Sequence, residues 1–144
     1  MSTEPDLIRR KRATAATLAK YRPLPFDWKK GVTCVHMARF HLRKMGHAVP
    51  VLPRMRGPIG AKRALAERGW DSVTAMLDAQ PGLERIAPAM MLPGDLAALP
   101  DDSGFDAIVI CGSRHKLLGW HQDWNGGMIE MEASLDALTG AWRA

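Results

Sequence analysis

The segment Pro25-Phe26-Asp27-Trp28-Lys29-Lys30-Gly31-Val32-Thr33-Cys34 decides the fold of this chain. A loop rich in aromatic residues and proline leads into an amphipathic stretch, which predicts a helix over residues 32–45 that ends at Gly46. A cysteine in the first turn of a helix faces unpaired N–H groups and the positive end of the helix dipole. Both favour the thiolate, so Cys34 is a candidate nucleophile.

Helices are expected in the first half of the chain and strands in the second. Periodicity and capping residues predict helices over residues 4–20, 32–45, 59–68 and 72–79. Extended segments are predicted at residues 86–91, 95–99, 105–111, 117–121 and 128–131. Because the helices precede a small antiparallel sheet, the predicted fold class is α+β.

Two further expectations concern the ends of the chain. The first helix is expected to bury an apolar stripe made of Leu7, Ile8, Ala15, Leu18 and Ala19. Near the C-terminus a helical turn is expected at residues 134–138, and residues 141–143 are expected to form an irregular tail.

Composition predicts an ordinary globular domain. The chain has 144 residues, of which 47% are hydrophobic and 24% charged, and this length suits one domain. The sequence shows neither a membrane-spanning apolar run nor a signal peptide. Two cysteines, Cys34 and Cys111, could form one disulfide, but their spacing does not require it, and a reduced, cytoplasmic origin is expected.

Charge is divided unequally along the chain. Residues 1–68 contain 16 Lys and Arg against 4 Asp and Glu, a formal charge of +12, whereas residues 69–144 contain 4 against 11, a formal charge of −7. A basic face of this kind suits nucleic acid, an anionic cell-wall polymer or neighbouring protein subunits. Protein subunits are the preferred interpretation, because no nucleic-acid motif appears and base-stacking aromatics are not interleaved with the basic residues.

Several short motifs occur in an order typical of one family. The first matching pieces are the leading helix, residues 25–28 and Cys34. The later pieces are Gly60-Ala61 with Leu65 and Gly69, then Pro93-Gly94-Asp95-Leu96, residues 108–112 and Trp142-Arg143. In these pieces the chain resembles the NlpC-type papain-like cell-wall cysteine peptidases, and more closely a related branch of phage and prophage tail proteins. The resemblance implies one papain-like domain over residues 1–144. Within it, residues 1–24 would form the leading helix and linker, 25–80 the helical half and 86–133 the β-sheet half.

The chain departs from this family at its reactive groups. Lys29 follows Trp28 where the family has glycine, and Thr33 precedes Cys34 where the family has aspartate. The position of the family's catalytic histidine is occupied by Asp106. Aspartate has a reference pKa of about 3.9, against about 6.5 for histidine, so it cannot replace imidazole as a base near pH 7.

The candidate catalytic residues are therefore Cys34, His121 and Asp106. His121 would be the base, oriented by Asp106 or Asp123, and His115 is a second candidate base. His41 shares a helical face with Cys34 but lies about 10 Å along the axis. Neither a metal nor another cofactor is expected, since no CxxC, HExxH or phosphate-binding motif occurs.

Two functions from different classes follow from the resemblance. The first is a structural or adaptor component of a phage or prophage-derived tail tip, made in the bacterial cytoplasm and assembled into the virion tail among other tail-tip and hub proteins. The second is an active cysteine peptidase or amidase that cleaves peptidoglycan during DNA entry. A module that binds nucleic acid through the basic half is the third and least favoured.

Overall fold

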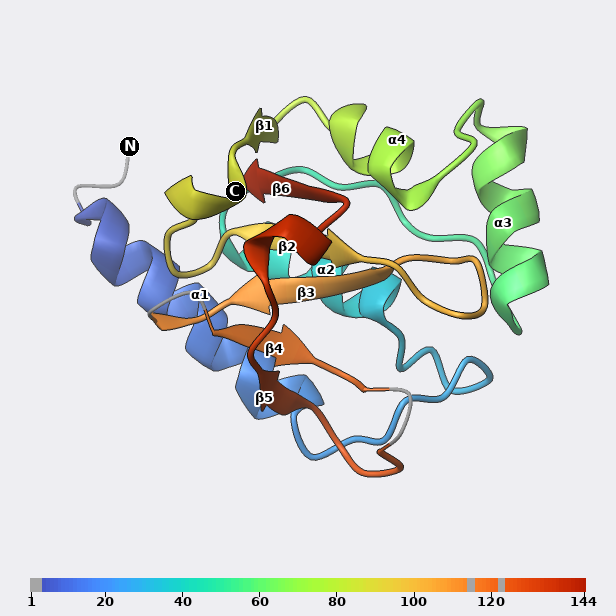
Figure 1. The fold of residues 1–144 in the computed structure, drawn as a ribbon, viewed down its shortest axis with the longest axis horizontal. Helices are drawn as coiled ribbons and strands as arrows, with labels where there is room; N and C mark the ends of the chain where they lie inside the picture. Colours follow the sequence, from blue (N-terminus) through green and yellow to red (C-terminus); the bar gives the residue numbers. More distant parts are fainter. Residues whose placement is uncertain (1–3, 114–115, 122–123) are drawn as a thin grey trace.

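The computed structural model describes residues 4–113, 116–121 and 124–144, which form a layer of helices against an antiparallel sheet (Figure 1). The helices are α1 (Asp6–Tyr21), α2 (Cys34–Lys44), α3 (Pro58–Glu67) and α4 (Val73–Asp78). The strands are β1 (Glu84–Ile86), β2 (Leu96–Leu99), β3 (Ala107–Cys111), β4 (Leu117–Gly119), β5 (Ile129–Met131) and β6 (Gly140–Arg143). Short 3-10 turns occur at η1 (Pro88–Met90) and η3 (Leu135–Ala137). The predicted α+β class is confirmed.

Local capping signals explain where the helices begin. Thr33 precedes α2 and its side-chain oxygen accepts a hydrogen bond from the backbone N–H of His36. Ser72 caps α4 in the same way, accepting from the N–H of Ala75. Pro58 occupies the first position of α3, where its missing N–H costs nothing. These signals lie within a few residues of the helix starts, which is why the sequence predicts them.

The described part of the sheet has the strand order β1-β6-β2-β3-β4-β5, and every pair is antiparallel. Neighbouring strands from β2 to β5 are consecutive in sequence, as expected. The exception is β6, which lies between β1 and β2 and pairs Ala141 with both Ile86 and Ala97. The prediction of an irregular tail at residues 141–143 is therefore wrong. Both partners of this strand are more than 40 residues away, so no local pattern reveals the pairing.

The sheet extends beyond the expected range of residues 86–133, since it begins at Glu84 and ends at Arg143. The expected strand at 86–91 is also shorter than predicted. Its first part belongs to β1, which ends at Ile86, and residues 88–90 form the turn η1. Pro88 fixes φ and lacks a donor, which favours this break in the ladder.

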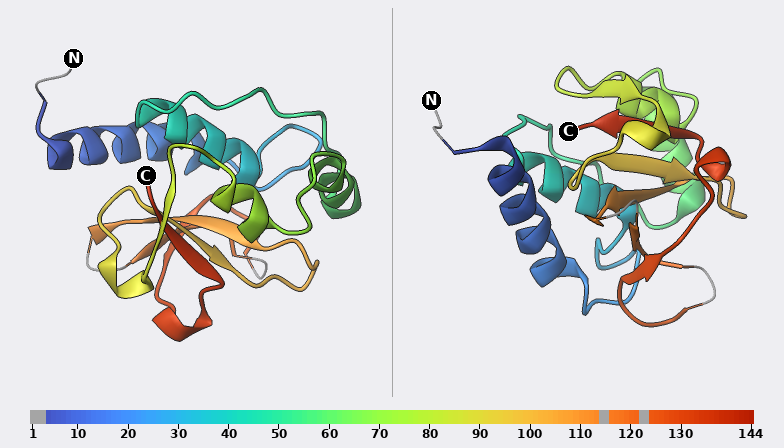
Figure 2. Two further views of the ribbon diagram at one scale, coloured as in Figure 1. Left: turned by 90° about the horizontal axis from the view of Figure 1, so that it is seen from above. Right: turned by 60° about the vertical axis from the view of Figure 1, so that its left-hand side comes forward.

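One face of the sheet is covered by α1 and α2, which lie side by side in both views of Figure 2. Alternate residues of β3 divide between two clusters: Ile108 and Ile110 belong to the large core shared with the helices, whereas Val109 and Cys111 belong to a smaller cluster on the opposite face. Partly buried residues such as Met131 and Leu135 pack against this smaller cluster. The uninterrupted apolar run of β3 therefore reflects burial on both faces.

The buried face of α1 differs from the predicted apolar stripe. Its buried residues are Arg10, Ala13, Thr14, Thr17 and Tyr21. Leu7 and Ile8 are instead 49% and 51% exposed. The helix can bury polar groups because they have partners, for example the hydroxyl of Thr14, which donates to the carbonyl of Arg10 one turn earlier.

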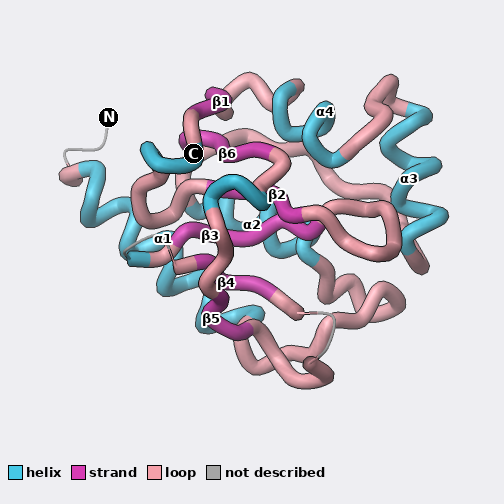
Figure 3. The backbone as a smooth tube through the Cα atoms, viewed as in Figure 1, coloured by secondary structure: helices cyan, strands magenta, loops and turns pink. Residues whose placement is uncertain are grey.

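Loops gather at one end of the molecule, where the α1–α2 connection approaches the segment that joins β4 to β5 (Figure 3). Two long-range hydrogen bonds hold them together. The indole N–H of Trp120 donates to the carbonyl of Leu24 at 2.8 Å, and the N–H of Met128 donates to the carbonyl of Arg22 at 2.9 Å. The loop before Cys34 is thereby fixed to the sheet. No helix among the described residues is long and apolar enough to cross a membrane.

Candidate functional site

Cys34 is the first residue of α2, and the loop before it is a closed hairpin. Asp27 and Val32 exchange backbone hydrogen bonds of 2.8 and 2.9 Å, and the Asp27 carboxylate accepts a hydrogen bond from the N–H of Lys29. Gly31 adopts φ of 70°, a left-handed conformation that suits glycine. These local features direct the chain into the helix and fix the position of the thiol.

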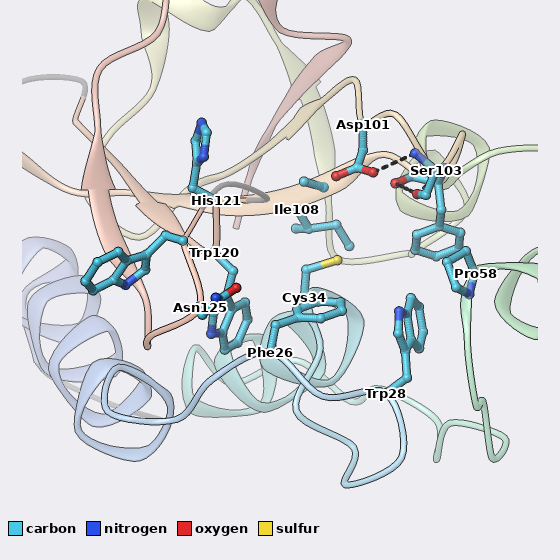
Figure 4. Close-up of a pocket in the computed structure, with 13 residues that line it drawn as sticks. Phe26, Trp28, Cys34, Pro58, Asp101, Ser103, Ile108, Trp120, His121 and Asn125 are labelled. Carbon is cyan, nitrogen blue, oxygen red and sulfur yellow. Dashed lines mark hydrogen bonds between the residues drawn. The ribbon is translucent and has the colours of Figure 1, made fainter.

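The thiol lies in a cleft of about 370 Å³, a size typical of small-ligand sites (Figure 4). Cys34 and Ile108 are among its lining residues, so the cleft lies where α2 meets β3. Aromatic residues make up much of its wall: Phe26, Trp28, Phe105, Trp120 and Trp124. Among the described lining residues, the polar side chains are Asp101, Ser103, His121 and Asn125.

The aromatic rings form a continuous edge-to-face series. Trp28 contacts Phe105 with ring centroids 5.7 Å apart and Phe26 at 5.6 Å, and Phe26 contacts Trp120 at 5.7 Å. Trp120 continues the series to Tyr21 at the end of α1. Such pairs are favourable beyond their buried area, so the wall of the cleft is built in advance of any ligand.

The pKa of the Cys34 thiol is raised to about 11, mainly by burial and in part by the negative charge of Asp101. Backbone N–H groups of Ile108 and of the helix start act in the opposite direction but are outweighed. Only 5% of the residue is exposed, which explains why desolvation of the charged form dominates. The expected thiolate is therefore not found, and Cys34 is a neutral thiol at pH 7.

His121 lines the same cleft as Cys34 and is exposed. Figure 4 shows its imidazole directed away from the Cys34 sulfur, which itself points toward the Trp28 side of the cleft. The structure thus brings the predicted nucleophile and base into one cleft without aiming one at the other.

Asp106 is not among the described residues that line the cleft. It immediately precedes β3, and its carboxylate accepts a hydrogen bond of 3.1 Å from the hydroxyl of Thr139. In this position it fastens the segment before β6 to the sheet. The alternative base His115 and the alternative orienting residue Asp123 lie outside the described residues.

His36 and His41 are engaged elsewhere. The His36 ring bonds to the Thr33 hydroxyl at 2.7 Å. His41 is fully buried, with Nε2 donating to the carbonyl of Gly94 at 2.8 Å and Nδ1 lying 2.9 Å from the hydroxyl of Thr17. Burial lowers the pKa of His41 to about 4. Both imidazoles belong to α2 and have structural roles.

Asp101 is a residue of the cleft that the sequence did not reveal. It begins the turn between β2 and β3, and its Oδ1 accepts a hydrogen bond of 2.8 Å from the N–H of Ser103. The sequence Asp101-Asp102-Ser103-Gly104 predicts a turn, which is correct, but a turn motif does not show which side chain faces a cleft. Its proximity to Cys34 arises only when the hairpin packs beside α2.

The described residues contain no group of three or more His, Cys, Asp or Glu side chains arranged to hold a metal ion. Comparison of the sequence with protein families gives one match, over residues 7–144, to a domain of unknown function, DUF6950. The chain belongs to the DUF6950 family. Comparisons with curated proteins and with solved structures give no match. The DUF6950 match covers all the described helices and strands apart from Asp6 at the start of α1.

Proposed function

We propose that this DUF6950 chain is a structural or adaptor subunit of a phage or prophage-derived tail tip, with a papain-like, NlpC-type fold and a degraded active site. The observation that carries the proposal is the state of Cys34. A cysteine at the start of a helix packed on an antiparallel sheet suits that fold, but the thiol is buried, its pKa is raised to about 11, and the cleft imidazole is directed away from it. A nucleophilic cysteine requires an accessible thiol, a lowered pKa and a base directed at the sulfur.

The distribution of charge supports a role as a subunit between different neighbours. Residues 1–68 supply α1, α2 and α3, whereas residues 69–144 supply the whole described sheet. Three of the helices therefore come from the basic part of the chain, and the described sheet comes from the acidic part. Two parts of opposite charge favour two different partners, which we propose to be other tail-tip and hub proteins.

The test is the composition of purified particles. The chain, carrying an affinity tag, is produced in the bacterium that makes the particle, and tails are separated by density gradient. We expect the protein to copurify with tails in a fixed ratio to other tail proteins, measured by quantitative mass spectrometry. Its absence from tails, with all of it remaining in the cytoplasmic fraction, would overturn the proposal.

A second candidate is a cysteine peptidase or amidase that cleaves peptidoglycan, and it is favoured by the presence of Cys34 and His121 in one cleft. In this alternative Cys34 attacks the scissile carbonyl, and N–H groups at the start of α2 stabilise the oxyanion. A turbidity assay on purified cell walls decides between the candidates. Cys34→Ala and the matched variant Cys111→Ala are compared with the wild type. If the wild type and Cys111→Ala clear the walls and Cys34→Ala does not, the site is active and the degraded-site proposal fails.

A further inference from the structure

The cleft beside Cys34 has an uneven distribution of charge. Asp101 is the only carboxylate among the described residues that line it, and these residues include no lysine or arginine. The basic residues of the chain belong mostly to residues 1–68, whereas Asp101 lies in the acidic remainder. A ligand that enters this cleft therefore meets the negative charge of Asp101, which no lysine or arginine among the described lining residues neutralises.

The carboxylate of Asp101 is held in a fixed position. Its Oδ1 accepts from the N–H of Ser103 at 2.8 Å, and its backbone carbonyl accepts from the N–H of Gly104 at 2.9 Å. Gly104 has φ of 78°, which closes the turn. Figure 4 shows the carboxylate pointing into the cleft on the side of Cys34. Because the turn uses only Oδ1, the second oxygen can accept a hydrogen bond from a ligand.

Aromatic rings occupy the other side of the cleft. Phe26 and Trp28 lie across Cys34 from Asp101 in Figure 4, and their mutual edge-to-face contact fixes both rings. Phe26 is still 40% exposed, so part of its surface remains available. The faces of aromatic rings attract cations, and the attraction is stronger where water is excluded.

The charge of Asp101 also acts on the sulfur of Cys34. Burial is the main cause of the raised pKa of this thiol, and the negative charge of Asp101 adds to it, so the field of Asp101 reaches the floor of the cleft. A cation bound near Asp101 would oppose this field and lower the pKa of Cys34. A change in the pKa of Cys34 can therefore report binding even if the ligand does not contact this residue.

We infer that the cleft binds an alkylammonium group, with the Asp101 carboxylate as counter-ion and the rings of Phe26 and Trp28 as cation–π partners. The group it fits is the side chain of a lysine presented by a neighbouring subunit. The identity of that subunit rests on the proposed function, whereas recognition of ammonium does not. A sugar is the poorer fit, because a neutral sugar leaves the charge of the Asp101 carboxylate without a counter-ion.

The inference is tested on the purified protein with Nα-acetyl-lysine amide, which keeps its side-chain ammonium group, and with its uncharged analogue Nα-acetyl-norleucine amide. Binding is followed by tryptophan fluorescence and by the rate at which iodoacetamide alkylates Cys34. We expect the lysine compound to bind at least about tenfold more tightly than the norleucine compound, as for other contacts to a charged group. Equal binding of the two compounds, or none by either, would overturn the inference.

The matched variants are Asp101→Asn and Asp102→Asn. The amide introduced by Asp101→Asn retains the oxygen that accepts from Ser103, and the exposed Asp102 does not line the cleft. We expect Asp101→Asn to weaken binding of the lysine compound about tenfold or more and Asp102→Asn to leave it unchanged. Thermal unfolding of both variants checks that the fold is retained.

Three results contradict the ammonium site: equal affinity in the two variants, an effect confined to Asp102→Asn, or binding of N-acetylglucosamine oligomers in place of the lysine compound. The test also separates this inference from the proposed function. If the protein binds the lysine compound but is absent from tails, the ammonium site is supported and the tail assignment fails. If the protein is present in tails but does not bind the lysine compound, the tail assignment is supported and the ammonium site fails.

Discussion

At the scale of single residues, environment determines what Cys34 and His41 can do. Both are types of residue that carry chemistry at neutral pH, and both lie on α2. Burial opposes the charged form of each, so the thiol keeps its proton and the imidazole stays unprotonated at pH 7. Their positions on a helix were predictable, but their ionisation was not.

The first prediction concerns the reactivity of Cys34. Since its pKa is raised to about 11, the alkylation rate with iodoacetamide should still be rising with pH at pH 9 and should be slow at pH 7. The measurement is mass spectrometry of each cysteine peptide after timed labelling of the native protein. Cys111, whose pKa burial also raises to about 11, serves as an internal comparison. A rate that levels off below pH 8 would show an activated thiolate.

The second prediction concerns His41 and acid. Its folded pKa of about 4 lies below the unfolded value of 6.5, so its contribution to stability is complete above pH 6.5 and is lost as the pH falls toward 4. Between pH 7 and pH 5 this loss should be about 2 kcal/mol of unfolding free energy. Urea unfolding at the two pH values measures it. His41→Gln should be less stable at pH 7 but show a smaller change, and an unchanged pH dependence would contradict the assignment.

At the scale of elements, α1 and β6 show how contacts override local pattern. The helix places Ile8 in solvent and Thr17 in the core, the reverse of what apolar periodicity predicts. The strand β6 buries Trp142 completely, and the indole N–H of this residue donates to Asp78 at the end of α4. In both elements the decisive partners are distant in the sequence.

The third prediction compares two substitutions within α1. Thr17→Val removes the hydroxyl next to Nδ1 of His41 and leaves this buried acceptor without a partner, which should cost about 1–3 kcal/mol. Ile8→Gln changes an exposed side chain and should alter stability by less than about 0.5 kcal/mol. Chemical unfolding of both variants is the measurement. A larger loss for Ile8→Gln than for Thr17→Val would mean that the helix packs through its apolar side.

At the scale of the whole molecule, one buried carboxylate joins three parts of the fold. Asp95, which is completely buried, lies 2.6 Å from the Arg10 guanidinium of α1 and 3.1 Å from Arg143 of β6. It also accepts from the N–H of Leu92 just before β2. Asp95 belongs to the Gly94-Asp95 pair that contributed to the family resemblance, and its role in this chain is structural.

The fourth prediction is that breaking this network destabilises the whole domain. Arg10→Met removes a buried partner of Asp95 and should cost about 3–5 kcal/mol, because part of a buried charge is left uncompensated. The control is Arg12→Met in the same helix, since Arg12 pairs with Glu4 at the surface and its loss should matter far less. Unfolding free energies of both variants are compared with the wild type. Similar losses of unfolding free energy in Arg10→Met and Arg12→Met would contradict a stabilising role of the buried network.

The α+β class, the helix starts and the order of the strands from β2 to β5 were predictable from the amino-acid sequence. These features depend on signals within a few residues, such as the Thr33 cap, the turn at residues 101–104 and the apolar run of β3. The sequence also indicated Cys34 as the residue around which a site would form. Local physical chemistry is sufficient for each of these.

Three features became visible only in the folded molecule: the buried face of α1, the place of β6 between β1 and β2, and the grouping of Asp101 and the aromatic rings around Cys34. Each depends on residues far apart in the chain, whose contacts do not appear in any local period. The loss of thiolate character has the same origin. A helix start favours the charged form, but desolvation by the folded core outweighs it, and burial exists only once the chain has folded.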